Sequence, residues 1–299
     1  RDGVQNAIFT LGLQFVLRRG IIGKNSREDE KMELRYTVID PTKNITLLVT
    51  TPVPRDVQPR VAAELLRRER DAEQVGFVEG LAAGNPRLQM MGGEFCGNAT
   101  MSMAAWLHRD LPIGESRALT LPVSGASEPV SCQVTHLDGC FIGTVSMPLP
   151  ERMETLSLPV CGVRQSLPVV FLPGICHVIV PADMIGRDRA EDTLRAWGDL
   201  LPGEAMGLLL LDEGQTAFTP LVYVKPTDSC VWERGCGSGS AAIGAWLTSV
   251  RGTDQCVSLR QPGGVIQVVT RTEDGAHLTA LTITGTVCLG ESKTTAVAL

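Results

Sequence analysis

The sequence predicts an α+β protein made of two pseudo-symmetric halves, each with several strands around one long apolar helix. A twelve-residue stretch occurs twice, at 96–107 and 236–247, and both copies begin with Cys-Gly and end with Ala-Trp-Leu. The copies start 140 residues apart in a chain of 299, so each half carries one. Both copies continue into a run so apolar that the helix it predicts must be buried nearly all round. Strand-like segments follow each copy, which extends the repeat beyond the helices.

The first half alternates strand-like and helical patterns up to the first copy of the repeat. β-Branched and aromatic residues favour the strands, and Pro59 suits a helix start that places Val61 and Leu65 on one face. The helix that follows Cys96 should end near Arg109, because a proline comes soon after. We expect strands at 4–16, 46–53, 76–79 and 87–91, a loop at 23–31 and a helix at 59–74.

The segments after each helix resemble one another. Three strand-like segments lie in 118–147, and others follow the second helix, with turns expected at Ser124-Gly125, Asp138-Gly139, Pro262-Gly263-Gly264 and Asp274-Gly275. The stretch from 147 to 153 is rich in proline and charge, which favours a boundary there. We therefore expect one domain from 1–147, completed by 287–299, and a second from 148–286.

Composition limits the function classes. The net charge of −6 and the scarcity of lysine argue against a nucleic-acid surface, and no apolar run is long enough to span a membrane. The run at 7–17 lacks the features of a signal peptide, and nine cysteines, an odd number, favour free thiols in a reducing cytoplasm. The chain begins at Arg1 without Met, so we expect that some N-terminal sequence is missing. A homodimer is left open.

The repeated stretch has the features of a helix start that receives an anion. Small residues after Cys96 and Cys236 leave the first N–H groups of each helix uncovered, at the positive end of the helix dipole. A thiol at such a position is expected to be more acidic than free cysteine. Two copies related by an internal repeat suggest two thiols that face one ligand.

Other interpretations of these cysteines fit the sequence less well. Most free cysteines are small buried core residues, but the repeat and the neighbouring glycines disfavour that reading here. Cys230 and Cys236 have the wrong spacing for a zinc knuckle, so no metal is expected. A Cys–His hydrolase would have no use for a second copy of the stretch. A pyridoxal-dependent enzyme needs a Schiff-base lysine, and none of the five lysines lies in such a motif, so no cofactor is expected.

Inversion of an amino-acid α-carbon fits two thiols well. One base removes the α-proton and an acid on the opposite face replaces it, so each group must be able to accept and donate a proton. Hydrogen bonds to the substrate carboxylate stabilise the carbanion, and two helix N-termini can supply them. The expected partner is a small-molecule amino acid.

Several motifs resemble those of the diaminopimelate epimerase family. Cys96-Gly97-Asn98 is similar to its Cys-Gly-Asn-Gly, and residues 233–239, Glu-Arg-Gly-Cys-Gly-Ser-Gly, are similar to its Glu-Arg-Gly and second cysteine elements. Pro262-Gly263-Gly264 and Gly285 also match, so the resemblance covers most of the chain. It implies a cofactor-independent racemase or epimerase with Cys96 and Cys236 as its two bases. It also implies two pseudo-symmetric domains, each a β-barrel-like sheet around a central helix, with the active site between them.

The chain departs from that family where the distal end of diaminopimelate is held. Two asparagines of the family are replaced here by Ile175 and Ala205, which would leave a charged substrate end without partners. Glu79 stands where the family has an amide. It either lines the pocket, where an acid would favour a basic side chain or an N–H donor, or is a solvated residue at the end of a strand. We therefore expect histidine or a short basic amino acid, as in the histidine racemases of this superfamily. Diaminopimelate epimerase, a proline racemase-like enzyme and a catalytically silent amino-acid-binding protein are the alternatives.

The remaining candidate site residues follow from the resemblance and from helix geometry. Helix-start residues are expected to bind the substrate carboxylate or α-amino group, although Asn98 and Ser238 could simply cap helices. His177 either orients the ligand or a thiolate, or is structural. Glu233 either holds the α-ammonium or pairs with Arg234. The full set of expected substrate contacts is Asn6, Glu79, Gly97, Asn98, His177, Glu233, Arg234, Gly237 and Ser238.

Overall fold

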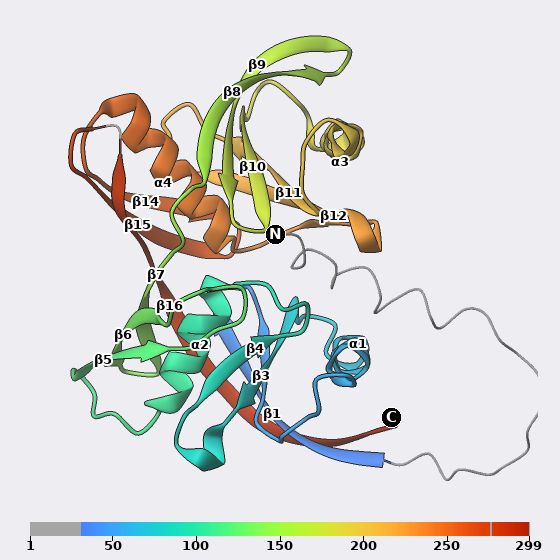
Figure 1. Ribbon diagram of the computed structural model, residues 1–299, viewed down its shortest axis with the longest axis vertical. Helices are drawn as coiled ribbons and strands as arrows, with labels where there is room; N and C mark the ends of the chain where they lie inside the picture. The colour runs from blue at the N-terminus through green and yellow to red at the C-terminus, as the bar shows by residue number, and fades with distance from the viewer. Residues whose placement is uncertain (1–30, 276, 299) are drawn as a thin grey trace, which may run out of the picture.

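The computed structural model describes residues 31–275 and 277–298 as an α+β structure built on two β-sheets (Figure 1). The larger sheet has ten strands. Eight of them follow one path, in the order β4 (Arg87–Met90), β3 (Gln74–Glu79), β2 (Thr46–Val49), β1 (Lys31–Pro41), β16 (Leu278–Ala298), β7 (Cys140–Ser146), β6 (Val130–Leu137) and β5 (Ser116–Leu121). The other two, β15 (Gly264–Thr272) and β14 (Gln255–Gln261), join this path through β16.

The smaller sheet has six strands. Their order is β13 (Ser229–Trp232), β12 (Phe218–Val224), β11 (Ala205–Leu211), β10 (Ile175–Pro181), β9 (Val163–Leu172) and β8 (Arg152–Val160). Each sheet contains one parallel pair, β2 with β3 and β10 with β11. Parallel neighbours need a crossover, and helices α1 (Gln58–Arg68) and α3 (Arg187–Ala196) provide it.

The long strand β16 connects the two ends of the molecule. Its first part pairs with β15, its middle part with β7, and its last part, from Val287 to Ala298, with β1 (Figure 1). Residues 287–298 are thus central to the sheet that contains the first half of the chain. The boundary expected near residue 147 falls between β7 and β8, where the chain leaves the larger sheet for the smaller one. The division into two domains stays a prediction.

The two repeated helices form the centre of the core, which confirms the prediction from their apolar sequence. Helix α2 (Gly97–Leu107) is buried from Gly97 to Ala105, and most of α4 (Gly237–Arg251) is buried. Both belong to one continuous hydrophobic cluster, together with residues from both sheets such as Val145, Ile179 and Ile283. Separate clusters lie under α1 and α3. The core therefore joins the starts of both helices to a shared framework.

Most elements predicted around the repeat are confirmed, and others are wrong or lie outside the described residues. The expected strands at 46–53, 76–79 and 87–91, and the three in 118–147, correspond to β2, β3, β4, β5, β6 and β7. The helix expected over 59–74 ends at Arg68, because the chain must turn there to enter β3 at Gln74. The strand expected at 4–16 and most of the loop at 23–31 lie outside the described residues, and Lys31 already belongs to β1. A second sheet was expected from the two-half plan, but the sequence analysis located neither β1 nor the individual strands of the smaller sheet.

The expectation of free cysteines throughout is wrong for one pair. Cys140 and Cys288 form a disulfide, with 4.4 Å between their Cα atoms. They lie on β7 and β16, in line with the neighbouring register pair Phe141 and Val287. Adjacent antiparallel strands bring such residues within disulfide range however far apart they are in sequence, and here that separation is 148 residues. An odd cysteine count therefore did not exclude a disulfide.

Within residues 31–275 and 277–298, no helix is both long enough and apolar enough to cross a membrane.

Candidate active site

Cys96 and Cys236 occupy the same position on two different helices. Each is the N-cap residue, in extended conformation, and each sulfur accepts a hydrogen bond from the third residue of its helix. The distances are 3.4 Å from the Ala99 nitrogen and 3.2 Å from the Gly239 nitrogen. The predicted location of both thiols at helix starts is confirmed. Helix geometry leaves the two preceding N–H groups of each helix without an intrahelical acceptor.

The two helix starts meet at the centre of the molecule. The Asn98 Nδ2 of α2 donates a hydrogen bond to the Gly235 carbonyl, just before α4, at 3.2 Å. A Cβ added at either Gly97 or Gly237 would lie 3.0 Å from the Cδ1 of the same residue, Ile283. Glycine at these two positions therefore lets both helix starts approach one side chain of β16. The structure brings Gly97, Asn98 and Gly237 together with the two cysteines.

Cys236 shares its surroundings with an acid. The Glu233 carboxyl lies within hydrogen-bonding reach of the Cys236 thiol, and burial raises the pKa of Glu233 to about 7. Burial and the Glu233 charge raise the pKa of the Cys236 thiol well above its usual value. The Cys236 backbone N–H is held by the Gln261 Oε1 at 2.6 Å, which fixes the start of the helix. The Cys236 thiol therefore keeps its proton near neutral pH, and the Glu233 carboxyl beside it is placed to accept that proton.

His177 reaches Cys236 through Ser238. Its Nε2 lies 2.9 Å from the Ser238 hydroxyl, which lies 3.5 Å from the Cys236 sulfur. Burial lowers the pKa of His177 to about 3, so the ring is neutral. Its Nδ1 is buried without a hydrogen-bond partner among the described residues, and a Cβ at Gly207 would collide with it. His177 therefore sits in a slot that a glycine on the neighbouring strand leaves open.

Cys96 faces an amide that the sequence reading missed. Its sulfur lies 3.0 Å from the Gln74 Oε1, at the beginning of β3. Gln74 in turn contacts Asn44, which is almost completely buried. Burial raises the pKa of the Cys96 thiol to about 12 and outweighs the helix N–H, which acts in the opposite direction. The expectation of an acidic thiol from the helix start alone is wrong, because desolvation has the larger effect on the pKa of Cys96.

A strained turn from the first half of the chain supports the segment before Cys236. Thr42 and Lys43 both have left-handed backbone conformations, with φ of 56° and 64°. A Cβ at Gly235 would lie only 2.2 Å from the Thr42 carbonyl oxygen, and one at Gly263 would be 2.5 Å from the Lys43 Cβ. The Gly263 N–H also donates to the Arg234 carbonyl at 2.7 Å. These glycines allow the turn to pack directly against the Glu-Arg-Gly segment.

The other residues considered for substrate binding lie in different parts of the structure. Arg234 is exposed, and no ion pair joins it to Glu233 among the described side chains. Its charge acts on Glu73 instead. Ile175 and Ala205 are direct register partners on β10 and β11, so the two positions that carry asparagine in the diaminopimelate epimerase family lie side by side. Asn6 lies outside the described residues.

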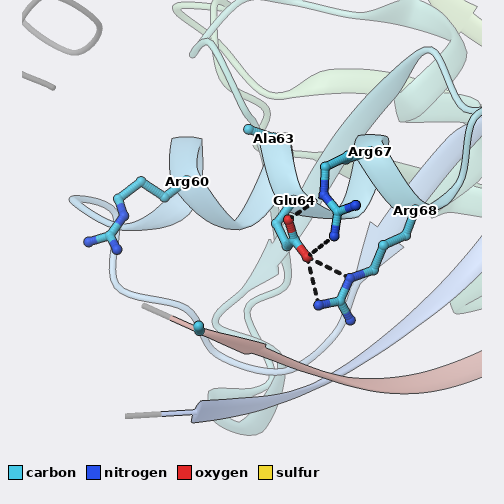
Figure 2. A pocket seen from close by; sticks show the side chains of 6 residues that line it. Arg60, Ala63, Glu64, Arg67 and Arg68 are labelled. Atoms are coloured by element: carbon cyan, nitrogen blue, oxygen red, sulfur yellow. Dashed lines mark hydrogen bonds and ion pairs between the residues drawn. The ribbon is translucent and has the colours of Figure 1, made fainter. Parts of the chain in front are cut away.

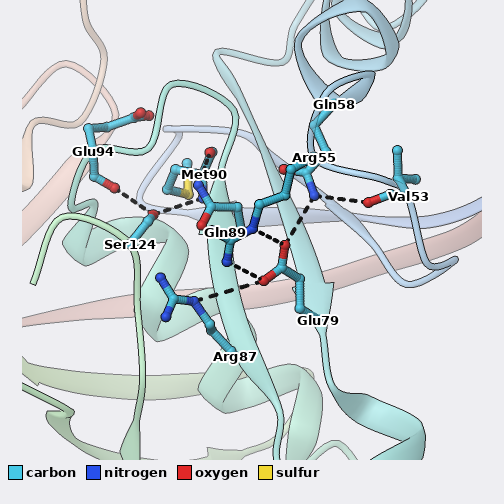
Figure 3. A network of polar contacts seen from close by, with 9 residues as sticks. All are labelled: Val53, Arg55, Gln58, Glu79, Arg87, Gln89, Met90, Glu94 and Ser124. Carbon is cyan, nitrogen blue, oxygen red and sulfur yellow. Dashed lines mark hydrogen bonds and ion pairs between the residues drawn. The ribbon is translucent and has the colours of Figure 1, made fainter. Parts of the chain in front are cut away.

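Glu79 is not part of this cluster, and its contact with the substrate stays a prediction. It lies at the end of β3 opposite to Gln74, about 16 Å along the strand. Its carboxylate accepts two hydrogen bonds from Arg55, at 3.0 and 2.8 Å, and one from Gln58 at 3.2 Å (Figure 3). The Arg87 Nε lies 3.9 Å from the Glu79 Oε2. The hydrogen bond with Arg55 is the main cause of its lowered pKa. The carboxylate has its own cationic partners, so it is not needed to hold a ligand.

Two surface hollows lie away from the cysteines. One, of about 450 Å³, is next to α1 and the end of β16, and its arginines are partly neutralised by Glu64 (Figure 2). Its lining residues are Arg60, Ala63, Glu64, Arg67, Arg68 and Ala298. The other, of about 320 Å³, lies between β1, β16 and the end of α2. Neither is lined by a residue of the cluster around Cys96 and Cys236.

The cluster is suited to proton transfer at a carbon atom. It combines two thiols at two converging helix starts, an acid of near-neutral pKa beside one thiol and an amide beside the other. The uncovered N–H groups at both helix starts can hold a carboxylate between them. Among the described residues, no group of His, Cys, Asp and Glu side chains is arranged to hold a metal ion.

Comparison with known sequences gives a consistent result. The sequence model described as the histidine racemase CntK N-terminal domain matches residues 33–293. A histidine racemase from Fusobacterium nucleatum subsp. nucleatum is 30% identical over 250 residues, which cover 81% of this chain and 91% of that protein. A histidine racemase from Staphylococcus aureus (strain Mu50) is 28% identical over 247 residues, covering 80% and 89%.

Solved structures share the fold at low sequence identity. A hydroxyproline epimerase from Agrobacterium vitis superposes with a TM-score of 0.65 at 13% identity, covering 89% of this chain and 92% of that chain. A PhzF-family phenazine biosynthesis protein from Bacillus anthracis gives 0.63 at 14% identity, covering 90% and 100%. A probable proline racemase from Agrobacterium radiobacter K84 gives 0.61 at 16%, covering 86% and 92%.

Proposed function

Because the chain belongs to the histidine racemase CntK family and is therefore an amino-acid racemase, an isomerase, we propose that it interconverts L- and D-histidine by proton transfer between Cys96 and Cys236. The main support for this proposal is the position of the two thiols. The two thiols cap two buried helices whose starts converge on Ile283, so a small ligand between them meets a sulfur from each helix.

The substrate carboxylate would be held by the helix starts. The N–H groups of Gly97, Asn98, Gly237 and Ser238 have no intrahelical acceptor and lie at the positive ends of two dipoles. As the α-proton leaves, negative charge moves onto the carboxylate oxygens, and the same donors stabilise it more strongly. These residues thus act both in binding and in lowering the barrier to proton removal.

The proton inventory of the reaction is balanced by the two thiols and one acid. Glu233 takes the proton from Cys236, and the resulting thiolate removes the α-proton from one face of the substrate. The Cys96 thiol donates its proton to the opposite face. The product leaves with Cys96 as the thiolate and Cys236 as the thiol, which is the form that acts on the other enantiomer. A proton must then pass from Cys236 to Cys96 through solvent before the same enantiomer is used again. Neutral His177 supports this step by positioning the Ser238 hydroxyl beside the Cys236 sulfur.

Histidine suits the apolar pair Ile175 and Ala205 on β10 and β11. Ile175 and Ala205 are paired across adjacent strands and are only partly buried, and Ile175 packs against the cluster that contains Cys236. An apolar wall accommodates the face of an imidazole ring, whereas the charged distal end of diaminopimelate would lose hydrogen bonds there. The charge of Glu73 raises the pKa of Glu233, and the charge of Arg234 lowers the pKa of Glu73. Glu73, rather than Glu79, is therefore the second acid close to the cluster.

We infer that the two halves form the two pseudo-symmetric domains expected from the repeat, each a curved sheet around its own helix. The order of elements supports this, because β2–α1–β3–β4–α2 in the first half has a counterpart in β10–α3–β11–β12–α4 in the second. In both, a helix crossover joins two parallel strands and an antiparallel strand follows. The homodimer left open above and the cytoplasmic location stay predictions.

The test is exchange of the α-proton in deuterated water. L-Histidine incubated with the protein should lose its α-proton NMR signal while D-histidine accumulates. Replacement of either Cys96 or Cys236 by serine should abolish racemisation, since a hydroxyl is a far weaker base near neutral pH. Binding of histidine without exchange would indicate a silent binding protein. Much faster turnover of diaminopimelate or proline would contradict the proposed substrate and leave the two-thiol chemistry in place.

A further inference from the structure

A line of polar side chains leads from a buried turn to the sulfur of Cys96. The Asn44 Nδ2 donates to the Glu73 carboxylate, and the Gln74 Nε2 donates to the Asn44 Oδ1 at 2.7 Å. The Gln74 Oε1 lies 3.0 Å from the Cys96 sulfur. Asn44 is only 5% exposed, so its amide has no alternative partners in water. These four residues form one chain of hydrogen bonds, which we term the Asn44 relay.

The direction of every bond in the Asn44 relay is determined by its neighbours. A carboxylate only accepts hydrogen bonds, so Glu73 orients the Asn44 amide with its NH₂ group towards the acid. The Asn44 oxygen then accepts from Gln74. Burial raises the pKa of Glu73, whereas the Asn44 hydrogen bond and the charge of Arg234 oppose that rise and favour the carboxylate.

Thr46 determines the same orientation independently. Its hydroxyl donates to the Asn44 backbone carbonyl at 3.2 Å, so its oxygen is free to accept from the Gln74 Nε2 at 2.8 Å. Two acceptors, Asn44 and Thr46, therefore both require the NH₂ group of Gln74. Only the carbonyl oxygen of that amide is left to face Cys96. An acceptor in contact with sulfur favours the protonated thiol over the thiolate.

The hydrogen-bond partners of Cys236 differ from those of Cys96. Its sulfur accepts the Gly239 N–H at 3.2 Å and lies 3.5 Å from the Ser238 hydroxyl. His177 can direct that hydroxyl towards the sulfur by donating to Ser238 from Nε2, which leaves its buried Nδ1 as a bare lone pair rather than an unpaired N–H. Glu233 is close enough to take the proton. Each sulfur accepts one backbone N–H, but Cys236 also has a hydroxyl and a carboxyl that can accept its proton beside it, whereas Cys96 faces an amide carbonyl that cannot accept one.

We propose that Asn44 and Thr46 are positioning residues that fix the Gln74 amide with its carbonyl towards Cys96, and thereby keep Cys96 as the thiol of the resting enzyme. Cys96 is then the proton donor of the first turnover and Cys236 the base. The assignment of catalytic roles rests on the proposed function. The effect of Asn44 and Thr46 on the Cys96 thiol does not, because it concerns a property of the folded protein without substrate.

The experiment measures alkylation of each cysteine by iodoacetamide at pH 8, resolved by peptide mass spectrometry. The double variant N44A/T46V removes both acceptors, so the Gln74 amide can rotate and present its NH₂ group to the sulfur. A change of one pKa unit corresponds to a tenfold change in thiolate fraction, so alkylation of Cys96 should accelerate about tenfold. The conservative variant T46S retains both acceptors and the donor to Glu73, and it should remain within about twofold of the wild type.

Other cysteines serve as internal controls in the same samples. Cys161 and Cys256 are exposed and report the reagent, and buried Cys132 reacts only if the first half of the chain opens. Unchanged Cys96 reactivity in N44A/T46V, with Cys132 still protected, would overturn the proposal. If Cys132 does react, Q74M decides, because it removes the carbonyl itself and should accelerate Cys96 alkylation to a similar extent; no acceleration in Q74M refutes the proposal. Failure of wild-type protein to exchange the histidine α-proton would refute the proposed function alone.

Discussion

Replacement of Glu233 by glutamine should stabilise the protein and inactivate it. The pKa of this carboxyl is raised from its ordinary value of 4.5 to about 7, mainly by burial. A carboxyl whose pKa is raised on folding contributes its full stability below the unfolded pKa, and this contribution is lost as the pH rises through the folded pKa. The loss for Glu233 therefore occurs between about pH 4.5 and pH 7.

The magnitude follows from the size of that shift. One pKa unit corresponds to about 1.4 kcal/mol, so ionisation of Glu233 in the folded protein costs up to about 3 kcal/mol. The residue is not completely buried, and solvent screening reduces the expected effect to about 2 kcal/mol. A glutamine has nearly the same shape and no charge, so the variant avoids this cost. Its advantage in free energy of unfolding should be near zero at pH 4 and reach about 2 kcal/mol at pH 8.

Urea denaturation of both proteins at pH 4, 5.5 and 8 measures this difference directly. Glu79→Gln is the matched control, because the hydrogen bond to Arg55 lowers the pKa of Glu79 instead of raising it. The Glu79 carboxylate stabilises the folded protein above its ordinary pKa, and this stabilisation is lost as the pH falls. Glu79→Gln should therefore lower the free energy of unfolding by less than about 1 kcal/mol at pH 8. If the Glu233 variant differed from the wild type by the same amount at all three pH values, the argument from burial would be wrong.

Three further predictions concern the site. Alkylation of either Cys96 or Cys236 should abolish racemisation in both directions, and loss of only one direction in an assay started from each enantiomer would contradict the two-thiol mechanism. The pair of substitutions Ile175→Asn and Ala205→Asn should lower kcat/KM for histidine about tenfold or more and raise turnover of diaminopimelate, measured on both substrates side by side. Glu79→Gln should leave kcat and KM for histidine within about twofold, because its carboxylate is bonded to Arg55 and not to the cysteine cluster.

The sequence predicted the parts of the site that are encoded locally. A Cys-Gly pair directly before an apolar run identifies a helix start without reference to any other part of the chain, so Cys96 and Cys236 were found from pattern alone. The partners of Cys96 have no such local signal. Gln74 lies 22 residues before it and is brought to it by the start of β3. Asn44 becomes significant only because the β1–β2 turn packs next to that strand.

Glu79 shows where the resemblance pointed to a residue outside the cysteine cluster. Successive residues of a strand are about 3.3 Å apart along it. A shift of five positions in an approximate alignment to the family therefore selects a residue outside the cluster. The disulfide was missed for a related reason. It depends on pairing between β7 and β16, which are distant in sequence, and a strand's own composition does not identify its partner.

The long strand β16 has a consequence for how this chain could be divided. It contributes to both halves, and residues 287–298 supply the neighbour of β1 in the sheet that contains the first half. A fragment that ends near residue 147 would lack that strand and leave one edge each of β1 and β7 unpaired, so it should aggregate. The same strand carries Ile283, on which both helix starts converge. A cut near residue 147 would therefore also remove from the start of α2 the side chain that it shares with α4.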